Sequence, residues 1–322
     1  MTPSLIFASA RNQYRSYYDL WNNREYFNSR KLLKGGYQCS YGEIKTNVVK
    51  VTDNKIHIYI EHGIDMIDTL DLVTSDVSNI KSVEIEIGGQ QIDIFNCVDL
   101  KTQINTLCEL YGNHRRVSNN YIPLEFLLLH INNIYAPLLM KYHDTKIIVI
   151  FYNGTQECKV NGNMYCLTND RHDLYSLKKV LNYGIQSYNY PNLVIKNGIN
   201  TYNLDECTNP SSMLYFWGFD KSKVKNIKLQ LDSYSYYYDG SIDSLEYRKQ
   251  SLGYTCDPVV MFFTTEKLTE YPQGTLNLSG MEKAQLIIET DQEETSNFYL
   301  VNIGARGLVY DKGMINYTVN SL

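Results

Sequence analysis

The chain has 322 residues, of which 43% are hydrophobic and 20% charged. This balance is typical of a folded globular protein and excludes a disordered one. The formal net charge of −5 argues against broad binding to nucleic acid or to an anionic membrane. We find no apolar run of about 18 residues and no basic start before a long apolar region, so we expect neither a transmembrane helix nor a signal peptide.

The first 35 residues are polar and mixed, with six basic residues among aromatic ones: Arg11, Arg15, Arg24, Arg30, Lys31 and Lys34. We expect an N-terminal arm that leads into the first strand. From residue 38 onward apolar and polar residues alternate with the period of a β-strand.

The clearest strand pair is predicted over residues 80–94. Val83, Ile85 and Ile87 alternate with polar residues, and two glycines at 88–89 can adopt the positive φ angles of a tight hairpin turn. The tripeptide that opens this segment, Asn79-Ile80-Lys81, reappears as Asn226-Ile227-Lys228 before a second alternating segment. Two β domains of similar size would produce such a repeat, and chance is the alternative.

One helix is predicted at about 97–111, where apolar residues share one face, Asn96 can cap the start and Gly112 can end it. Leucines near 170–182 allow a second, short helix. Asn161-Gly162-Asn163 is predicted to be a turn and a domain boundary. The short strands that follow do not alternate with helices, which favours sandwiches or barrels over a parallel α/β sheet.

Motifs that would indicate catalysis or cofactor binding are missing from the sequence. The six histidines form no metal-binding spacing, and no phosphate loop, dinucleotide fingerprint or G-x-S-x-G motif occurs. Neighbouring carboxylates such as Glu84 and Glu86 are typical of a solvated strand face. We therefore assign no catalytic residue, metal or cofactor. The seven cysteines are scattered and never form C-x-x-C, which indicates free thiols in a reducing compartment.

Tyrosine is the compositional outlier, with 29 residues. It suits half-exposed strands and protein interfaces, and an AT-rich coding sequence also contributes. The densest run is Ser-Tyr-Ser-Tyr-Tyr-Tyr-Asp-Gly at 233–240. Rigid aromatic residues there can form a contact patch, and the alternative is an ordinary strand end and loop. The candidate contact residues of this run are Tyr234, Tyr236, Tyr237 and Tyr238.

Several segments together resemble the double jelly-roll major capsid proteins of nucleocytoplasmic large DNA viruses. Residues 80–93 resemble the hairpin of the first domain in that family, and Tyr271-Pro-Gln-Gly-Thr-Leu-Asn-Leu-Ser279 resembles its late P-x-G-x-x-N-F-S segment. The other matching segments, in the family's order, are 121–126, 136–147, 165–171, 210–217, 228–231 and 284–288. The stretch 130–134 and the segment 279–282 depart from the family pattern.

The resemblance implies an all-β protein: two antiparallel eight-stranded jelly-roll sandwiches in tandem, with a few short helices. It places the arm at 1–35, the first jelly roll at 36–160 and the second at 161–322. It implies a homotrimeric, pseudo-hexagonal capsomer that tiles an icosahedral shell, in a virion assembled in the host cytoplasm. Partners would be further copies of the chain, penton and minor capsid proteins and an inner membrane, without specific nucleic acid.

Under this resemblance Arg11, Arg15 and Arg24 of the arm are candidate contacts to the inner side of the shell. The alternative for the arm is a strand that covers a sheet edge. Other functions also stay open: a minor capsid or transient scaffold protein of the same fold, a carbohydrate-binding β-sandwich, or a β-sandwich hydrolase.

Overall fold

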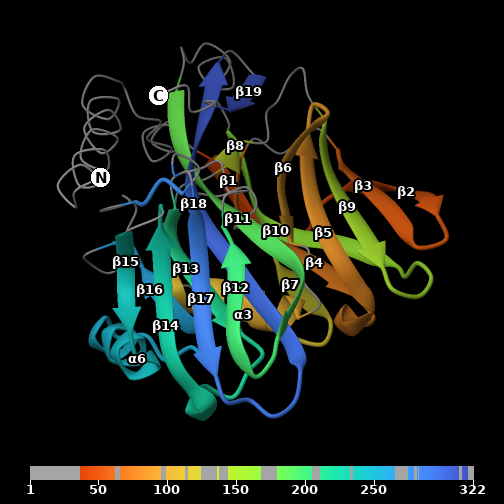
Figure 1. Cartoon of the computed structure of the whole chain (residues 1–322). Coiled ribbons are helices and arrows are strands. Elements are labelled where there is room, and N and C mark those ends of the chain that lie inside the picture. Colours follow the sequence, from red (N-terminus) through yellow and green to blue (C-terminus); the bar gives the residue numbers. More distant parts are fainter. Residues whose placement is uncertain are drawn as a thin grey trace. The chain divides into compact units, whose positions relative to one another are not determined.

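The computed structural model describes residues 37–61, 66–95, 99–112, 115–124, 136–137, 144–167, 180–204, 211–232, 235–264, 275–278, 281, 283–311 and 314–317. These residues divide into two compact units. One comprises the described residues up to 185 together with those from 306 onward, and the other comprises 186–305. Figure 1 labels the helices and strands of both units.

The first unit contains two antiparallel sheets that form the first sandwich. One sheet has the order β1-β10-β4-β7, with β8 also paired to β4. The other has the order β2-β3-β9-β5-β6. The strands are β1 (Tyr37–Glu43), β2 (Thr46–Thr52), β3 (Lys55–Ile60), β4 (Met66–Thr74), β5 (Ile80–Ile87), β6 (Gln90–Phe95), β7 (Tyr121–Pro123), β8 (Ala136–Pro137), β9 (Thr145–Phe151) and β10 (Cys158–Leu167).

The second sandwich is built from two further antiparallel sheets. Their orders are β11-β18-β13-β16, with β19 paired to the end of β18, and β12-β17-β14-β15. The strands are β11 (Val180–Ile195), β12 (Gly198–Asn203), β13 (Ser211–Trp217), β14 (Val224–Leu231), β15 (Ser235–Gly240), β16 (Val259–Phe262), β17 (Ala284–Thr290), β18 (Ser296–Asp311) and β19 (Met314–Tyr317).

The two sandwiches share one topology among the described residues. If β2, β8 and β19 are set aside, each sandwich has eight strands in sequence order. In both, the first, eighth, third and sixth strands form one sheet and the second, seventh, fourth and fifth form the other. This is the arrangement of a jelly roll. The prediction of two antiparallel jelly-roll sandwiches in tandem is therefore confirmed.

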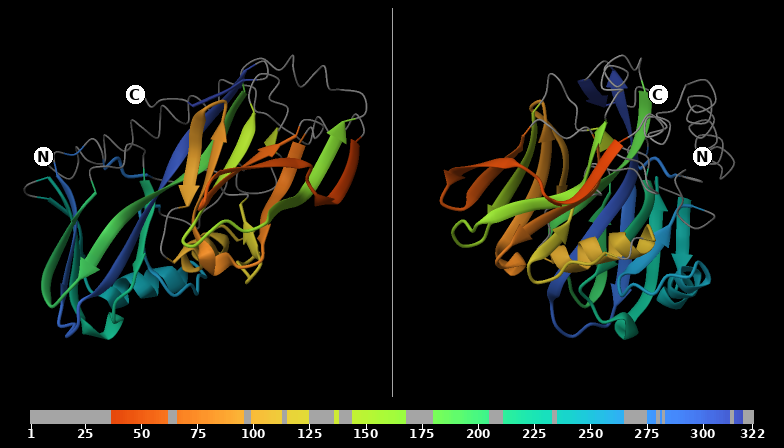
Figure 2. Two further views of the ribbon diagram at one scale, coloured as in Figure 1. Left: turned by 90° about the vertical axis from the view of Figure 1, so that its right-hand side faces the viewer. Right: turned by 180° about the vertical axis from the view of Figure 1, so that it is seen from behind.

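A helix follows the fifth strand of each sandwich. Helix α3 (Leu100–Leu110) lies between β6 and β7, and α6 (Ile242–Ser251) lies between β15 and β16. The helix predicted at 97–111 is thus confirmed as α3, but its cap is Asp99, whose side chain accepts a hydrogen bond from the Thr102 amide. Sequence periodicity did not indicate α6. Figure 2 shows it across one end of its sandwich. The short helix expected near 170–182 falls largely outside the described residues.

The core of the second sandwich lies between its two sheets. Buried side chains from both sheets form one hydrophobic cluster, which includes Leu214 and Phe216 of β13 and Leu286 and Ile288 of β17. In the first sandwich, alternate residues of β3, β5 and β9 are buried in the same way. Sheet-on-sheet packing requires one apolar face per strand, and the period-2 alternation of the sequence supplies that face.

Two details of the sequence-based prediction differ from the structure. Asn161-Gly162-Asn163, which was expected to form a turn, lies within β10 and pairs with both β1 and β4. Glycine is required there because a β-carbon at 162 would overlap the Thr69 carbonyl oxygen. Strand β10 therefore belongs to the first sandwich. The domain bounds 36–160 and 161–322 stay a prediction.

The internal repeat also aligns different residues from those that the sequence suggested. Strands β5 and β14 are the fourth strands of their sandwiches, but the shared Asn-Ile-Lys tripeptides are not equivalent: Asn79 ends the turn before β5, whereas Asn226 lies within β14. The equivalent residues, however, are in the turns before them. Asp76 accepts hydrogen bonds from the amide and hydroxyl of Ser78, and Asp220 does the same for Ser222. The structural repeat is Asp-x-Ser, in which the aspartate caps a single 3-10 turn that leads into the strand.

Candidate assembly surfaces

The tyrosine run ends in β15, the edge strand of its sheet among the described residues. Tyr237 is 42% exposed, and its ring meets Phe263 edge-on at a centroid distance of 5.5 Å. Burial of the hydroxyl raises the pKa of Tyr237. The side chain of Tyr238 folds back, donates a hydrogen bond to the Ser241 carbonyl at 2.7 Å and packs against the core. Of these two tyrosines, Tyr237 is the one available for a contact.

The other candidate contacts cannot be placed in the same way. The backbone of Tyr236 pairs with Gln230, but its side chain lies outside the described part of the chain. Tyr234 and the three arginines of the arm, Arg11, Arg15 and Arg24, also lie outside the described residues. Their role in assembly remains a prediction.

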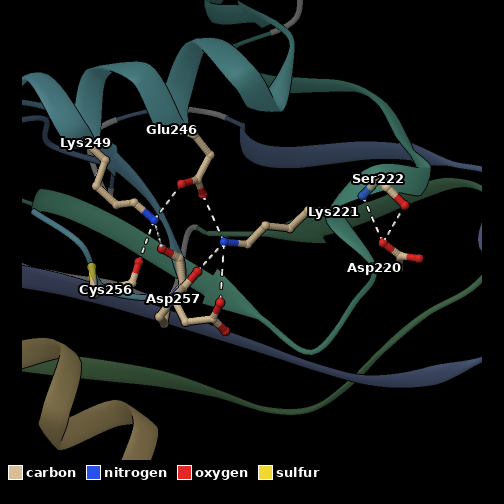
Figure 3. A network of polar contacts seen from close by, with 8 residues as sticks. Asp220, Lys221, Ser222, Glu246, Lys249, Cys256 and Asp257 are labelled. Carbon is tan, nitrogen blue, oxygen red and sulfur yellow. Dashed lines mark hydrogen bonds and ion pairs between the residues drawn. The ribbon is translucent and has the colours of Figure 1, made fainter.

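A polar network fixes α6 to the end of the second sandwich (Figure 3). The Lys249 side chain is 3% exposed, and its ammonium donates to the carbonyls of Cys256 at 2.6 Å and Pro258 at 3.0 Å. Glu246, one turn earlier on the same helix, contacts this ammonium at 2.7 Å. A buried ammonium is tolerated because every proton finds an acceptor.

Glu246 extends the network to a second lysine. Its other carboxylate oxygen lies 3.1 Å from the ammonium of Lys221 in the turn before β14. Lys221 also donates to the backbone carbonyl of Asp257. One carboxylate therefore joins the helix, the Asp-x-Ser turn and the segment before β16. The fixed helix presents Tyr247, which is 75% exposed, to solvent. Sequence analysis did not predict this network, because burial is inferred from apolar residues and Lys249 is charged.

The outward face of β3, β9 and β5 in the first sandwich is polar but only partly exposed. Lys146 pairs with Glu86 at 2.6 Å and lies 6.0 Å from the centre of the Tyr59 ring. Burial raises the pKa of Glu84. Burial, followed by the charges of Lys146 and Lys55, lowers the pKa of His57. This strand face, which the sequence predicted to be solvated, instead holds charged side chains that are partly removed from water.

Among the described residues, strand β2 forms an edge of this sheet and has no fully buried side chain. Asn47 to Thr52 are all exposed. Among them Val48, Val49 and Val51 are 45%, 41% and 47% exposed. Exposed apolar side chains on an edge strand are typical of a surface that pairs with another strand.

The described residues contain no group of three or more His, Cys, Asp or Glu side chains that could hold a metal ion. Within the same part of the chain, no helix is long and apolar enough to cross a membrane. Burial raises the pKa of the Cys158 thiol to about 11, so this thiol is protonated near neutral pH. The buried carboxylate of Asp71 is paired with Arg115.

Two jelly-roll sandwiches in one polypeptide define a double jelly-roll protein. Solved structures with a similar backbone include viral capsid proteins. The chain superimposes on the PBCV-1 virus capsid model with a TM-score of 0.67 at 13% identity, covering 92% of this chain and 98% of that one. The Faustovirus major capsid protein gives 0.55 at 9% identity, covering 86% and 91%.

The major capsid protein of bacteriophage PM2 gives a TM-score of 0.53 at 12% identity, covering 83% of this chain and 98% of that one. No family model matches the chain, and no curated protein matches it by sequence. At these identities the likeness establishes the fold: this chain has the double jelly-roll fold found in viral major capsid proteins.

Proposed function

We propose that the chain is a structural capsid protein of a virus, and that its copies associate into homotrimeric capsomers that tile an icosahedral shell. The observation that carries this proposal is the strand order repeated in both sandwiches, together with nearly full-length agreement with the PBCV-1 virus capsid. The exposed edge strand β15 and the exposed face of α6 described above offer surfaces for contacts between copies.

The proposal extends to location and partners. The protein would lie in the virion after assembly in the host cytoplasm, in contact with further copies, penton and minor capsid proteins and an inner membrane. Closed trimers use head-to-tail contacts, in which one patch of a chain meets a different patch of the neighbouring copy. The edge strand with Tyr237 and the exposed face of α6 are the patches of the second sandwich that we assign to such contacts.

The test is the mass of the purified protein by light scattering, with negative-stain images. We expect particles of about three chains with a hexagonal outline. A monomer that persists at high concentration would contradict the proposal. Mass spectrometry of purified virions separates two roles of the same fold, because a transient scaffold is absent from mature particles and a shell protein is abundant there.

Deletion of residues 1–30 tests the role assigned to the arm. If the arm makes contacts on the inner side of the shell, the truncated protein should stay a soluble trimer and fail to form shells. A truncated protein that does not fold would instead show that the arm is part of a sandwich, as an edge-covering strand would be.

A further inference from the structure

Strand β2 has no counterpart in the shared eight-strand topology. The second strand of the first sandwich is β3, which matches β12 of the second sandwich, and β2 is an addition at the sheet edge beside it. Its partner β3 buries Ile56, Ile58 and Ile60, whereas β2 buries no side chain fully. The strand therefore contributes little to the core, and its three exposed valines need another explanation.

Two other edge strands of the first sandwich are protected against pairing, whereas β1 and β6 are longer edge strands without proline. Strands β7 and β8 span only three and two residues, and they carry Pro123 and Pro137. Short edge strands and prolines prevent edge-to-edge association. Strand β2 spans seven residues without proline, and six of them are exposed. It combines the length, the β-branched composition and the exposure that favour the addition of a strand.

The sequence of β2 is compatible with itself in an antiparallel pair. Val48 lies opposite Ile58 of β3 and Val49 opposite His57, so the two valines point to opposite faces of the sheet. In a two-fold pair centred on Val49, this valine meets its own copy and Lys50 lies opposite Val48. No lysine then faces a lysine, which avoids the like-charge repulsion that a pair centred on Lys50 would create.

We propose that β2 pairs antiparallel with β2 of a second copy, centred on Val49, and that this contact joins different capsomers. The inference rests on the proposed function, since it assumes that copies associate. A two-fold contact cannot occur within a closed three-fold ring, so it must link separate trimers. One strand pair buries far less than the roughly 1,200 Å² of a stable interface. The contact is therefore weak and reversible, and it gains strength from repetition in a lattice.

Disulfide trapping tests the register on the full-length protein. Val49→Cys should form a 49–49 cross-link under mild oxidation, identified as a linked peptide by mass spectrometry. Asn47→Cys is the matched control, because Asn47 is exposed on the same face of β2 but would lie opposite Val51, far from its own copy. Equal cross-linking at both positions, or none at position 49, would overturn the pairing.

Analytical ultracentrifugation tests the contact without a cross-link. The wild-type protein should show a concentration-dependent species of twice the trimer mass. Val49→Lys should lower its association constant roughly tenfold, because two like charges would lie directly opposite. Val49→Thr should retain it. If Val49→Lys leaves this species unchanged or abolishes the trimer itself, the inference is wrong. A wild-type monomer would instead contradict the proposed function.

Discussion

Gly42 and Gly162 lie directly opposite each other on β1 and β10, but only Gly162 lacks room for a side chain. A β-carbon at 162 would overlap the Thr69 carbonyl oxygen of β4 and press on Ile67 and Ile44. A β-carbon at 42 would meet only the terminal methyl of Met164, at 3.8 Å. The two glycines therefore form a matched pair for testing close approach in the first sandwich.

Gly162→Ala should lower the free energy of unfolding by about 1–3 kcal/mol, because the added methyl group forces backbone or core side chains to shift. Gly42→Ala should change it by less than about 0.5 kcal/mol, as for an ordinary tolerated substitution. Urea denaturation followed by circular dichroism measures both. Equal stability of the two variants would show that β10 and β4 can separate without cost.

Lys249→Met should destabilise the second sandwich by about 2–4 kcal/mol. The substitution removes the donor to two backbone carbonyls and one partner of Glu246, and unsatisfied buried groups are costly. The measurement is the urea midpoint monitored by near-ultraviolet circular dichroism.

The control for this variant is Lys225→Met, which removes an exposed ion pair with Asp291. Exposed pairs contribute little, so this control should unfold at the wild-type midpoint. If Lys249→Met matches its control, the buried ammonium does not hold α6 in place.

Stability should fall as the pH drops below about 6.5, in part through His57. Burial lowers the pKa of His57 in the folded protein, so the unfolded chain takes up the proton first. The contribution of this residue is fully present above the unfolded pKa and is lost as the pH falls towards the lower folded value. The melting temperature of the His57→Gln variant should therefore fall less between pH 7 and pH 5 than that of the wild type. The same pH dependence in both proteins would show that another group is responsible.

Tyr237 and Tyr238 should respond differently to substitution. Tyr237→Ala should weaken self-association measured by light scattering, because an aromatic contact residue on an edge strand is lost. Tyr238→Phe removes the hydroxyl that donates to the Ser241 carbonyl, keeps the ring, and should leave association unchanged. If Tyr238→Phe is the variant that impairs association, the contact patch lies elsewhere on β15.

The sequence predicted those parts of the fold that depend on period-2 alternation and on strong local signals. The hairpin of β5 and β6 was found because Gly88 and Gly89 do adopt positive φ angles between alternating strands. Helix α3 was found because its apolar residues share one face. Both features are local, so a single sequence can reveal them.

Features that depend on distant partners were missed. Helix α6 carries few apolar residues, and Lys249 occupies a buried position that only the carbonyls of Cys256 and Pro258 make tolerable. The sequence around Gly162 is typical of a turn, but the glycine is needed because β4 lies too close to β10 for a side chain at this position. In each case the reason for the residue lies on another element, and residue spacing does not reveal it.

The adjacency of first and last strands has a consequence for synthesis on the ribosome. In both sandwiches the first strand pairs beside the eighth, so neither can be completed before its final strand has been made. The eight strands of the first sandwich are complete at Leu167, whereas the second sandwich must wait for β18, which ends at Asp311. While β11 to β17 are being made, the nascent polypeptide carries strands that lack their final partner β18 and are exposed to aggregation, so it depends on rapid completion or on chaperones.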